Sequence, residues 1–315
     1  MSIAITFVGI DVSKDRLDGF IRPQGVSFSE EYTDQGVEVV VEHMVKTRPN
    51  IILLEATGGY ETRIVAALAH HGFPVVLINP RQVRDFAKAT GKLAKTDKID
   101  AEVLAHFAEA VRPQVRHLPD QNQKELAALM SRRCQLVEIS VMEKNRIHRA
   151  TKLIKNRIQA HLDWLKTEID KIDKEISEFI KKSPILQRKA EIVKSMTGIG
   201  PTISRALVSY VPELGIINEK KICALVGVAP FNCDSGVFKG KRIVWGGRKQ
   251  IRSILYMGVL AAVRFNEVIR TFYQKLVGKG KPKKVALTAC MRKVLTILNA
   301  MVKSDSFWIE NYHSL

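Results

Sequence analysis

The sequence predicts an α/β domain, then a long helical hairpin, then a basic and mainly α-helical domain. Short apolar runs alternate with helical stretches up to residue 112, while residues 121–182 are almost free of Gly and Pro. Basic residues gather in the last third of the chain. We expect boundaries at 1–112, 113–187 and 188–315. With 315 residues, 46% of them apolar, the chain is long enough for two compact cores.

The first domain is expected to contain both strands and helices in a defined order. Five apolar, β-branched runs predict strands at 4–10, 16–23, 26–33, 50–56 and 73–79. Four amphipathic stretches predict helices at 35–47, 60–70, 81–90 and 96–111. Thr96 is the expected cap of the last helix. The order β-β-β-α-β-α-β-α, with the later strands parallel and covered by helices, is the RNase H-like arrangement.

An apolar seam marks the second segment. Its side chains are spaced alternately four and three residues apart: Ile158, Leu162, Leu165, Ile169, Ile172, Ile176 and Phe179. This period of about 3.5, flanked by Lys and Glu, predicts a long helical hairpin or coiled coil. The stripe can pack within one chain or between two chains, and the sequence leaves both open.

The third segment combines helices with Gly-rich and basic turns. Helical stretches flank Gly198 and Gly200, which resemble a helix-hairpin-helix turn whose backbone approaches a DNA phosphate. A plain Gly-rich turn is the alternative. We expect a short helix and strand at 220–232 and a basic, turn-rich stretch at 233–250. One or two helices are expected at 252–277, a basic loop at 279–284 and a closing helix at 285–303.

Charge gives the first indication of a partner. The formal net charge is +18; residues 1–112 hold 13 basic and 15 acidic residues, whereas residues 236–315 hold 16 and 3. Such a basic segment suits a polyphosphate partner, because each neutralised phosphate releases a counterion. We expect Arg248, Lys249 and Arg252 to contact nucleic-acid backbone. A solvated basic surface without a ligand remains the alternative.

The apolar runs and the cysteines indicate the compartment in which the protein is expected. No apolar run reaches the roughly 18 residues that cross a bilayer, and the N-terminal run meets Asp11 too early for a signal peptide. We therefore expect a cytoplasmic protein with no membrane partner. The cysteines Cys134, Cys223, Cys233 and Cys290 form no C-x-x-C pair, which favours reduced structural thiols over a zinc site.

Four acidic residues are the candidate catalytic centre. Asp11 and Glu55 end strands that lie side by side in this fold, and Asp97 and Asp100 share one face at a helix start. Singly, Asp11 or Asp97 is an ordinary strand or helix end. Glu55 is harder to dismiss, because it follows an apolar run where a carboxylate is costly. Together they predict a site for two Mg²⁺ or Mn²⁺ ions.

Several motifs resemble the insertion-sequence one-ten family of transposases, which includes the Piv/MooV-like DNA invertases. They run in order along nearly the whole chain: GIDVSKDRLD, LLEATGGYE, INPRQVRDFAKATG, KTDKIDAEVLA, SMTGIGPTISRALV, LVGVAPFNCDSG and ACMRKVL. K-T-D-x-x-D-A together with the downstream S-G is the most specific part.

This resemblance implies a RuvC-like first domain whose D-E-D-D tetrad maps onto Asp11, Glu55, Asp97 and Asp100. It implies that Ser235 attacks a phosphodiester and forms a covalent phosphoserine. Many members pair donor and target DNA through a structured bridge RNA. They assemble as homodimers and tetramers, with serine and tetrad contributed by different subunits. Cys233 and Asp234 depart from the usual residues before the serine, which puts the local loop shape in doubt.

The residues around Ser235 fit this role chemically. A serine hydroxyl needs a base or a metal to become a good nucleophile, and no His lies nearby in the sequence. Lys239, Lys241 and Arg242 follow the Gly-flanked serine and are expected to hold the scissile phosphate. Without the resemblance, Ser-Gly would be a common turn dipeptide.

The predicted function is therefore a metal-dependent DNA transposase or recombinase, with a Piv-like invertase without guide RNA as a close alternative. A RuvC-like endonuclease would share the tetrad but use water and need no serine. An actin-like sugar kinase or ATPase can also begin G-I-D-x-S but requires a duplicated second half. A silent DNA- or RNA-binding protein would show no metal-dependent chemistry.

Overall fold

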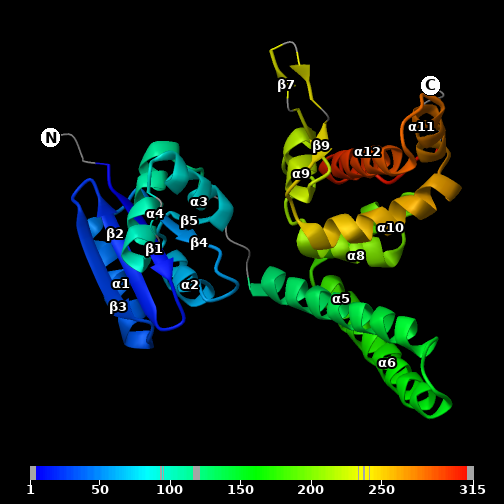
Figure 1. Cartoon of the computed structure of the whole chain (residues 1–315), viewed down its shortest axis with the longest axis horizontal. Helices are drawn as coiled ribbons and strands as arrows, with labels where there is room; N and C mark the ends of the chain where they lie inside the picture. The colour runs from blue at the N-terminus through cyan, green and yellow to red at the C-terminus, as the bar shows by residue number, and fades with distance from the viewer. Residues whose placement is uncertain are drawn as a thin grey trace. The chain divides into compact units, whose positions relative to one another are not determined.

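The computed structural model of the protein describes residues 5–92, 94, 96–115, 121–232, 234–236, 238–240 and 242–310. The chain divides into two compact units, Met1–Leu118 and Pro119–Leu315 (Figure 1). The expected helical segment 113–187 and the C-terminal segment 188–315 thus fall largely in one unit. Their buried side chains form one continuous core, which is why they do not separate.

A five-stranded mixed sheet organises the first unit. Its strands are β1 Phe7–Val12, β2 Arg16–Arg22, β3 Val26–Glu31, β4 Ile51–Glu55 and β5 Val75–Ile78. Across the sheet they run β3-β2-β1-β4-β5. The first three form an antiparallel meander, while β4 and β5 run parallel to β1. This is the predicted RNase H-like order, and each predicted strand is present.

Helices cover both faces of this sheet: α1 Asp34–Thr47, α2 Thr62–His70, α3 Pro80–Ala89 and α4 Asp97–Val111. On one face Val8 and Ile10 pack in one cluster with residues of α1 and α2. On the other, Phe7 and Leu53 pack with residues of α3 and α4. Because side chains alternate along a strand, the odd-numbered residues of β1 and β4 face α3 and α4.

A glycine lets helix α4 lie directly on strand β1. A Cβ atom at Gly9 would stand 2.3 Å from the carbonyl oxygen of Ala101 and 2.3 Å from the amide nitrogen of Ala105. Both are backbone atoms of α4, which no rotamer change can move away. The close approach brings the first turn of α4 to the end of β1, where Asp11 stands.

Replacing Gly9 with Ala is expected to destabilise this helix–strand contact by about 1–3 kcal/mol, because the added methyl overlaps α4 backbone. Hydrogen exchange of β1 and α4 amides, read by mass spectrometry, measures the loss. Gly278→Ala is the matched control, since a Cβ added there would meet no other atom within 4 Å. Equal protection in the two variants would contradict the close-packing explanation.

Two long helices open the second unit and confirm the predicted helical hairpin. α5 spans Gln121–Ile147 and α6 spans Lys152–Lys182, and α6 folds back along α5 (Figure 1). From the predicted seam, Leu165, Ile172 and Ile176 are buried within the chain. Ile158 and Leu162, nearer the hairpin turn, are only half-buried. Coiled-coil packing between chains remains a prediction.

A buried ion-pair cluster holds the two hairpin helices to the next part of the unit. Asp173 of α6 accepts two hydrogen bonds from Arg133 of α5, at 3.0 and 3.1 Å. It also pairs with Arg205 of α8. All three side chains are largely buried, so loss of Asp173 would leave two guanidinium groups without this partner, which is costly.

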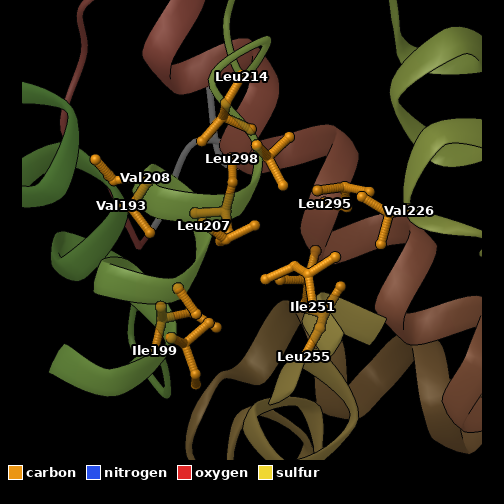
Figure 2. Packing of buried hydrophobic residues seen from close by; sticks show 14 of the residues in the cluster. Val193, Ile199, Leu207, Val208, Leu214, Val226, Ile251, Leu255, Leu295 and Leu298 are labelled. Atoms are coloured by element: carbon orange, nitrogen blue, oxygen red, sulfur yellow. The ribbon is translucent and has the colours of Figure 1, made fainter. Parts of the chain in front are cut away.

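Six shorter helices complete the second unit: α7 Pro184–Ser195, α8 Pro201–Tyr210, α9 Glu219–Val226, α10 Lys249–Phe265, α11 Glu267–Gly278 and α12 Lys283–Lys303. Leu207, Val226, Ile251 and Leu295 meet in their common core (Figure 2). Among the described residues, α12 alone is long and apolar enough to cross a membrane. Most apolar side chains of α12, Leu295 among them, are buried in the core of this unit.

A narrow two-stranded arm projects between α9 and α10. Its strands are β6 Pro230–Phe231, β7 Asp234–Ser235, β8 Phe238–Lys239 and β9 Ile243–Val244. β6 pairs with β9 and β7 pairs with β8, so the chain runs out and returns along itself (Figure 1). The basic stretch expected as turn-rich therefore forms a β-hairpin arm.

Candidate active site

The carboxylates of Asp11 and Glu55 lie at the ends of neighbouring parallel strands. The last registered pair between β1 and β4 is Ile10 with Leu54, and one residue further come Asp11 and Glu55. Both side chains belong to the odd-numbered set that faces α3 and α4. Both are half-buried. The expected side-by-side placement is therefore what the sheet provides.

The first turn of α4 brings two more carboxylates to this edge. The Thr96 hydroxyl accepts a hydrogen bond from the Ile99 amide at 3.3 Å, which confirms the predicted cap. Asp97 and Asp100 follow in the first turn. Burial raises the pKa of Asp11 from 3.8 to about 6, and the negative charges of Asp100 and then Asp97 add to the effect. Asp11, Asp97 and Asp100 are thus electrostatic neighbours.

The donor set suits a hard divalent cation. Carboxylate oxygens are the ligands that Mg²⁺ and Mn²⁺ prefer, and three of them share one electrostatic environment. Across the residues that the structure describes, no three Asp, Glu, His or Cys side chains close around a single point. The donors therefore suit a cation by their chemistry, and their side chains would have to rotate to close around it.

Stability of the metal-free protein should depend on the ionisation of Asp11. Its folded-state pKa of about 6 exceeds the ordinary 3.8, so the folded state binds more protons between these values. The contribution of Asp11 to stability is therefore present at low pH and lost as the pH rises through about 6. Thermal unfolding in a chelator, compared between wild type and Asp11→Asn, measures this. We expect Asn to be the more stable above that pH; parallel curves at all pH values would contradict the shift.

Ser235 stands at the tip of the arm and is exposed. It pairs with Phe238 across the two strands, and Gly236 follows it with a φ of 57°, the left-handed region that glycine adopts without strain. Arg242 is exposed on the returning side. Cys233 and Lys241 lie outside the described residues, and of Lys239 only the backbone is described.

Other predicted nucleic-acid contacts have internal partners. Arg248 donates to both carboxylate oxygens of Glu213 at 2.7 Å and to the carbonyl of Tyr210 at 2.6 Å. Arg252 donates to the carbonyls of Gly246 and Gly227. These bonds fix the two ends of the arm to the helices below it. Lys249 is exposed. Contact of these three residues with nucleic acid stays a prediction.

The two predicted contact glycines differ in their surroundings. Gly198 has a φ of 89°, and a Cβ there would lie 2.6 Å from the Cα of Ala262 in α10. Close helix packing therefore accounts for this glycine. Gly200 caps α8, and a Cβ added there would meet no other atom within 4 Å, so packing does not require a glycine at this position. Its contact with DNA or RNA stays a prediction.

Three polar residues on β2 and β3 stand out only in the structure. Asp18 stands directly opposite Asp11 on β2, and Ser29 stands opposite Asp18 on β3. Arg16 lies two residues from Asp18 on the same face of β2. The alternation of these polar residues with Leu17 in strand 16–23 is the signal that would have revealed them, once the register was known.

Comparison with known proteins gives relatives that match the whole chain and others that match about half of it. The chain is 26% identical to "Pilin gene-inverting protein" of Moraxella bovis over 98% of this chain and 99% of that protein. It is 28% identical to "Insertion element IS900 uncharacterized 42 kDa protein" of Mycobacterium paratuberculosis, over 48% of this chain and 38% of that one. "Insertion element IS116 uncharacterized 44.8 kDa protein" of Streptomyces clavuligerus is 29% identical over 49% and 38%.

One solved structure, "Thermus thermophilus RuvC structure", is similar over 33% of this chain and 95% of that one. Its identity is 16% and its TM-score 0.26, a likeness too weak to carry the fold assignment, which rests on the strand order.

Family profiles cover most of the chain. A profile described as "Transposase" matches residues 8–163, which include all four carboxylates. A second, described as "Transposase IS116/IS110/IS902 family", matches residues 190–274, which include Ser235 and its arm. The chain therefore belongs to the IS116/IS110/IS902 family of transposases.

Proposed function

We propose that this transposase cuts and rejoins DNA with divalent metal ions held by Asp11, Glu55, Asp97 and Asp100, and with Ser235 as nucleophile. The observation that carries the proposal is the electrostatic contact of Asp11 with Asp97 and Asp100, at the edge where Glu55 ends the adjoining strand. Carboxylates placed in this way repel one another. Their separate positions in the chain and common position in the fold are what a cation site requires.

Each acidic residue has a distinct support in this proposal. The sheet register fixes Asp11 and Glu55, whereas the capped first turn of α4 presents Asp97 and Asp100. When bound, Mg²⁺ or Mn²⁺ would neutralise these side chains and stabilise charge on the oxygens of a phosphodiester. Burial of Asp11 and its neighbours' charges disfavour its ionised form without a cation, so its affinity for a cation should fall at low pH.

The proposed serine chemistry consists of two transesterifications. The Ser235 oxygen bonds to a DNA phosphorus while the bond from phosphorus to a 3′ oxygen breaks, which leaves a phosphoserine and a free 3′ hydroxyl. The proton lost by the serine is balanced by the one that the 3′ oxygen gains. A 3′ hydroxyl of another DNA end then attacks the phosphoserine and releases Ser235. The exposure of Ser235 at the arm tip suits attack on so large a substrate.

Donor and target DNA are the proposed substrates, and a bridge RNA is the proposed guide. Homodimers that assemble into tetramers would let one subunit offer the serine and another the carboxylates. DNA inversion without a guide is the second candidate, favoured by the full-length similarity to a pilin gene-inverting protein. Sequencing RNA that co-purifies with the protein from its native operon separates the two.

The deciding experiment is incubation of purified protein and any bound RNA with DNA that carries the ends of its own element. We expect cleavage with Mg²⁺ and none in a chelator. Denaturing gels should show DNA covalently attached to protein. Cleavage that persists in a chelator would overturn the metal part of the proposal, and metal-dependent cleavage without an adduct would overturn the serine part.

A further inference from the structure

We infer that Arg16 binds a DNA phosphate beside the acidic site and is positioned there by Ser29 and Asp18. The inference rests on the proposed function, because it names how that site would hold its substrate. The charge around the site favours such a residue. A phosphodiester is an anion, and Asp18 adds negative charge that the proposed metal ligands do not include, so a cation beside it would favour the approach of the substrate.

The sheet register places three polar side chains in one row. Asp11 on β1 is paired with Asp18 on β2, and Asp18 is paired with Ser29 on β3. Directly paired residues in an antiparallel sheet point to the same face. Asp18 accordingly contributes to the negative surroundings of Asp11. The row extends the proposed site from the parallel half of the sheet onto its antiparallel half.

An ion pair identifies the face on which this row lies. Arg22 is on the same alternating side of β2 as Asp18 and Arg16. Its guanidinium pairs with Glu109 of α4 at 2.6 Å. The row is therefore on the α4 face, which also carries Asp97 and Asp100 at its first turn.

A chain of hydrogen bonds fixes the guanidinium of Arg16 to this row. Arg16 donates to the Ser29 hydroxyl at 2.6 Å, and that hydroxyl donates in turn to Asp18. The Ser29 hydroxyl thus donates its proton to the Asp18 carboxylate and accepts the hydrogen bond from Arg16 through a lone pair. The residue directly opposite Arg16 on β3 is Glu31. The Arg16 guanidinium nevertheless donates to Ser29, which is also on β3.

Geometry and exposure leave Arg16 able to bind an anion. One of its five N–H donors is committed to Ser29, the side chain is exposed, and a guanidinium fork matches two phosphate oxygens. Because Ser29 belongs to β3, a phosphate bound there would lie over β2 and β3, across the sheet from Asp11 on β1. We assign Arg16 to a phosphate that flanks the scissile one, with Ser29 and Asp18 as positioning residues.

The test compares variants in a Ser235→Ala background, which prevents strand cleavage while DNA binding is measured in Mg²⁺. Arg16→Ala should weaken binding of the element-end duplex about tenfold. It should also lower the slope of log affinity against log salt by about one, as expected for one lost phosphate contact. Arg16→Lys should restore the slope and part of the affinity. Ser29→Ala should weaken binding when Arg16 is present and have no effect when it is Ala.

Lys46→Ala is the matched control, because it removes the same charge from α1, which covers the opposite face of the sheet. We expect it to leave affinity and slope unchanged. An unchanged salt slope in Arg16→Ala, or equal losses in Arg16→Ala and Lys46→Ala, would overturn the inference. Cleavage by the protein with an intact Ser235 is assayed separately. Its absence would count against the proposed function, whereas cleavage together with an unchanged Arg16→Ala slope would count against the arginine alone.

Discussion

Replacing Asp11 with Asn is expected to lower the rate of DNA cleavage by at least about 10³-fold, with DNA affinity close to that of wild type. Asn has nearly the same shape, so the end of β1 should keep its packing. It removes a carboxylate whose ionisation burial and two neighbouring charges disfavour. Single-turnover cleavage of an end-labelled duplex, together with a binding titration, separates the two effects.

Asp15→Asn is the matched control for this variant. Asp15 is exposed in the turn that joins β1 to β2, so the same charge is removed from the same hairpin away from the carboxylates. We expect its cleavage rate to stay within about twofold of wild type, as for most surface substitutions. Near-normal cleavage by Asp11→Asn would remove the basis of the metal-site proposal.

Replacing Ser235 with Ala is expected to abolish the covalent protein–DNA product and to lower strand exchange by at least about 10⁴-fold, as for other covalent nucleophiles. The side chain is exposed at the arm tip, so its loss should leave the free energy of unfolding nearly unchanged. The adduct is measured on denaturing gels after nuclease digestion. Exchange is measured by the appearance of recombinant junctions.

A serine elsewhere in the same unit controls for this change. The Ser253 hydroxyl bonds to the Lys249 carbonyl at 3.1 Å within α10 and is expected to be dispensable. If Ser235→Ala still cleaved DNA at a near-normal rate, water would be the nucleophile and the protein would act as an endonuclease. If both serine variants lost activity equally, a folding defect of the unit would be the cause.

Hydrophobic periodicity was enough to predict the elements of the first unit. Continuous apolar runs such as Ile51–Leu54 are buried on both faces, and this double burial identifies central strands. The Thr96 cap and the long helical hairpin were predicted for the same local reasons. The β-hairpin arm was not, because its strands are two residues long and the apolar side chains of β6 and β9 are exposed. These two strands show no alternation of buried and exposed residues that a sequence pattern could reveal.

Placement of the carboxylates was predictable, but their surroundings were not. Strand order alone brings Asp11 beside Glu55. The contribution of Asp18 depends on the β1–β2 register, in which a shift of one residue would turn it to the other face. Likewise, Gly9 looks like any glycine in a strand until α4 is seen against it. The internal partners of Arg248 come from helices distant in the chain, so charge pattern alone suggested only a solvent-facing or nucleic-acid-facing role.

The shared core of the second unit has a mechanical consequence. Leu165 of the hairpin and Leu207 of α8 belong to one continuous apolar cluster, and Asp173 pairs with Arg205 across the same junction. Arg248, at the base of the serine arm, is bonded in turn to the carbonyl of Tyr210, which ends α8. We therefore expect the hairpin, α8 and the base of the arm to move together as one body. A force applied to the far end of the hairpin would then reach the base of the serine arm.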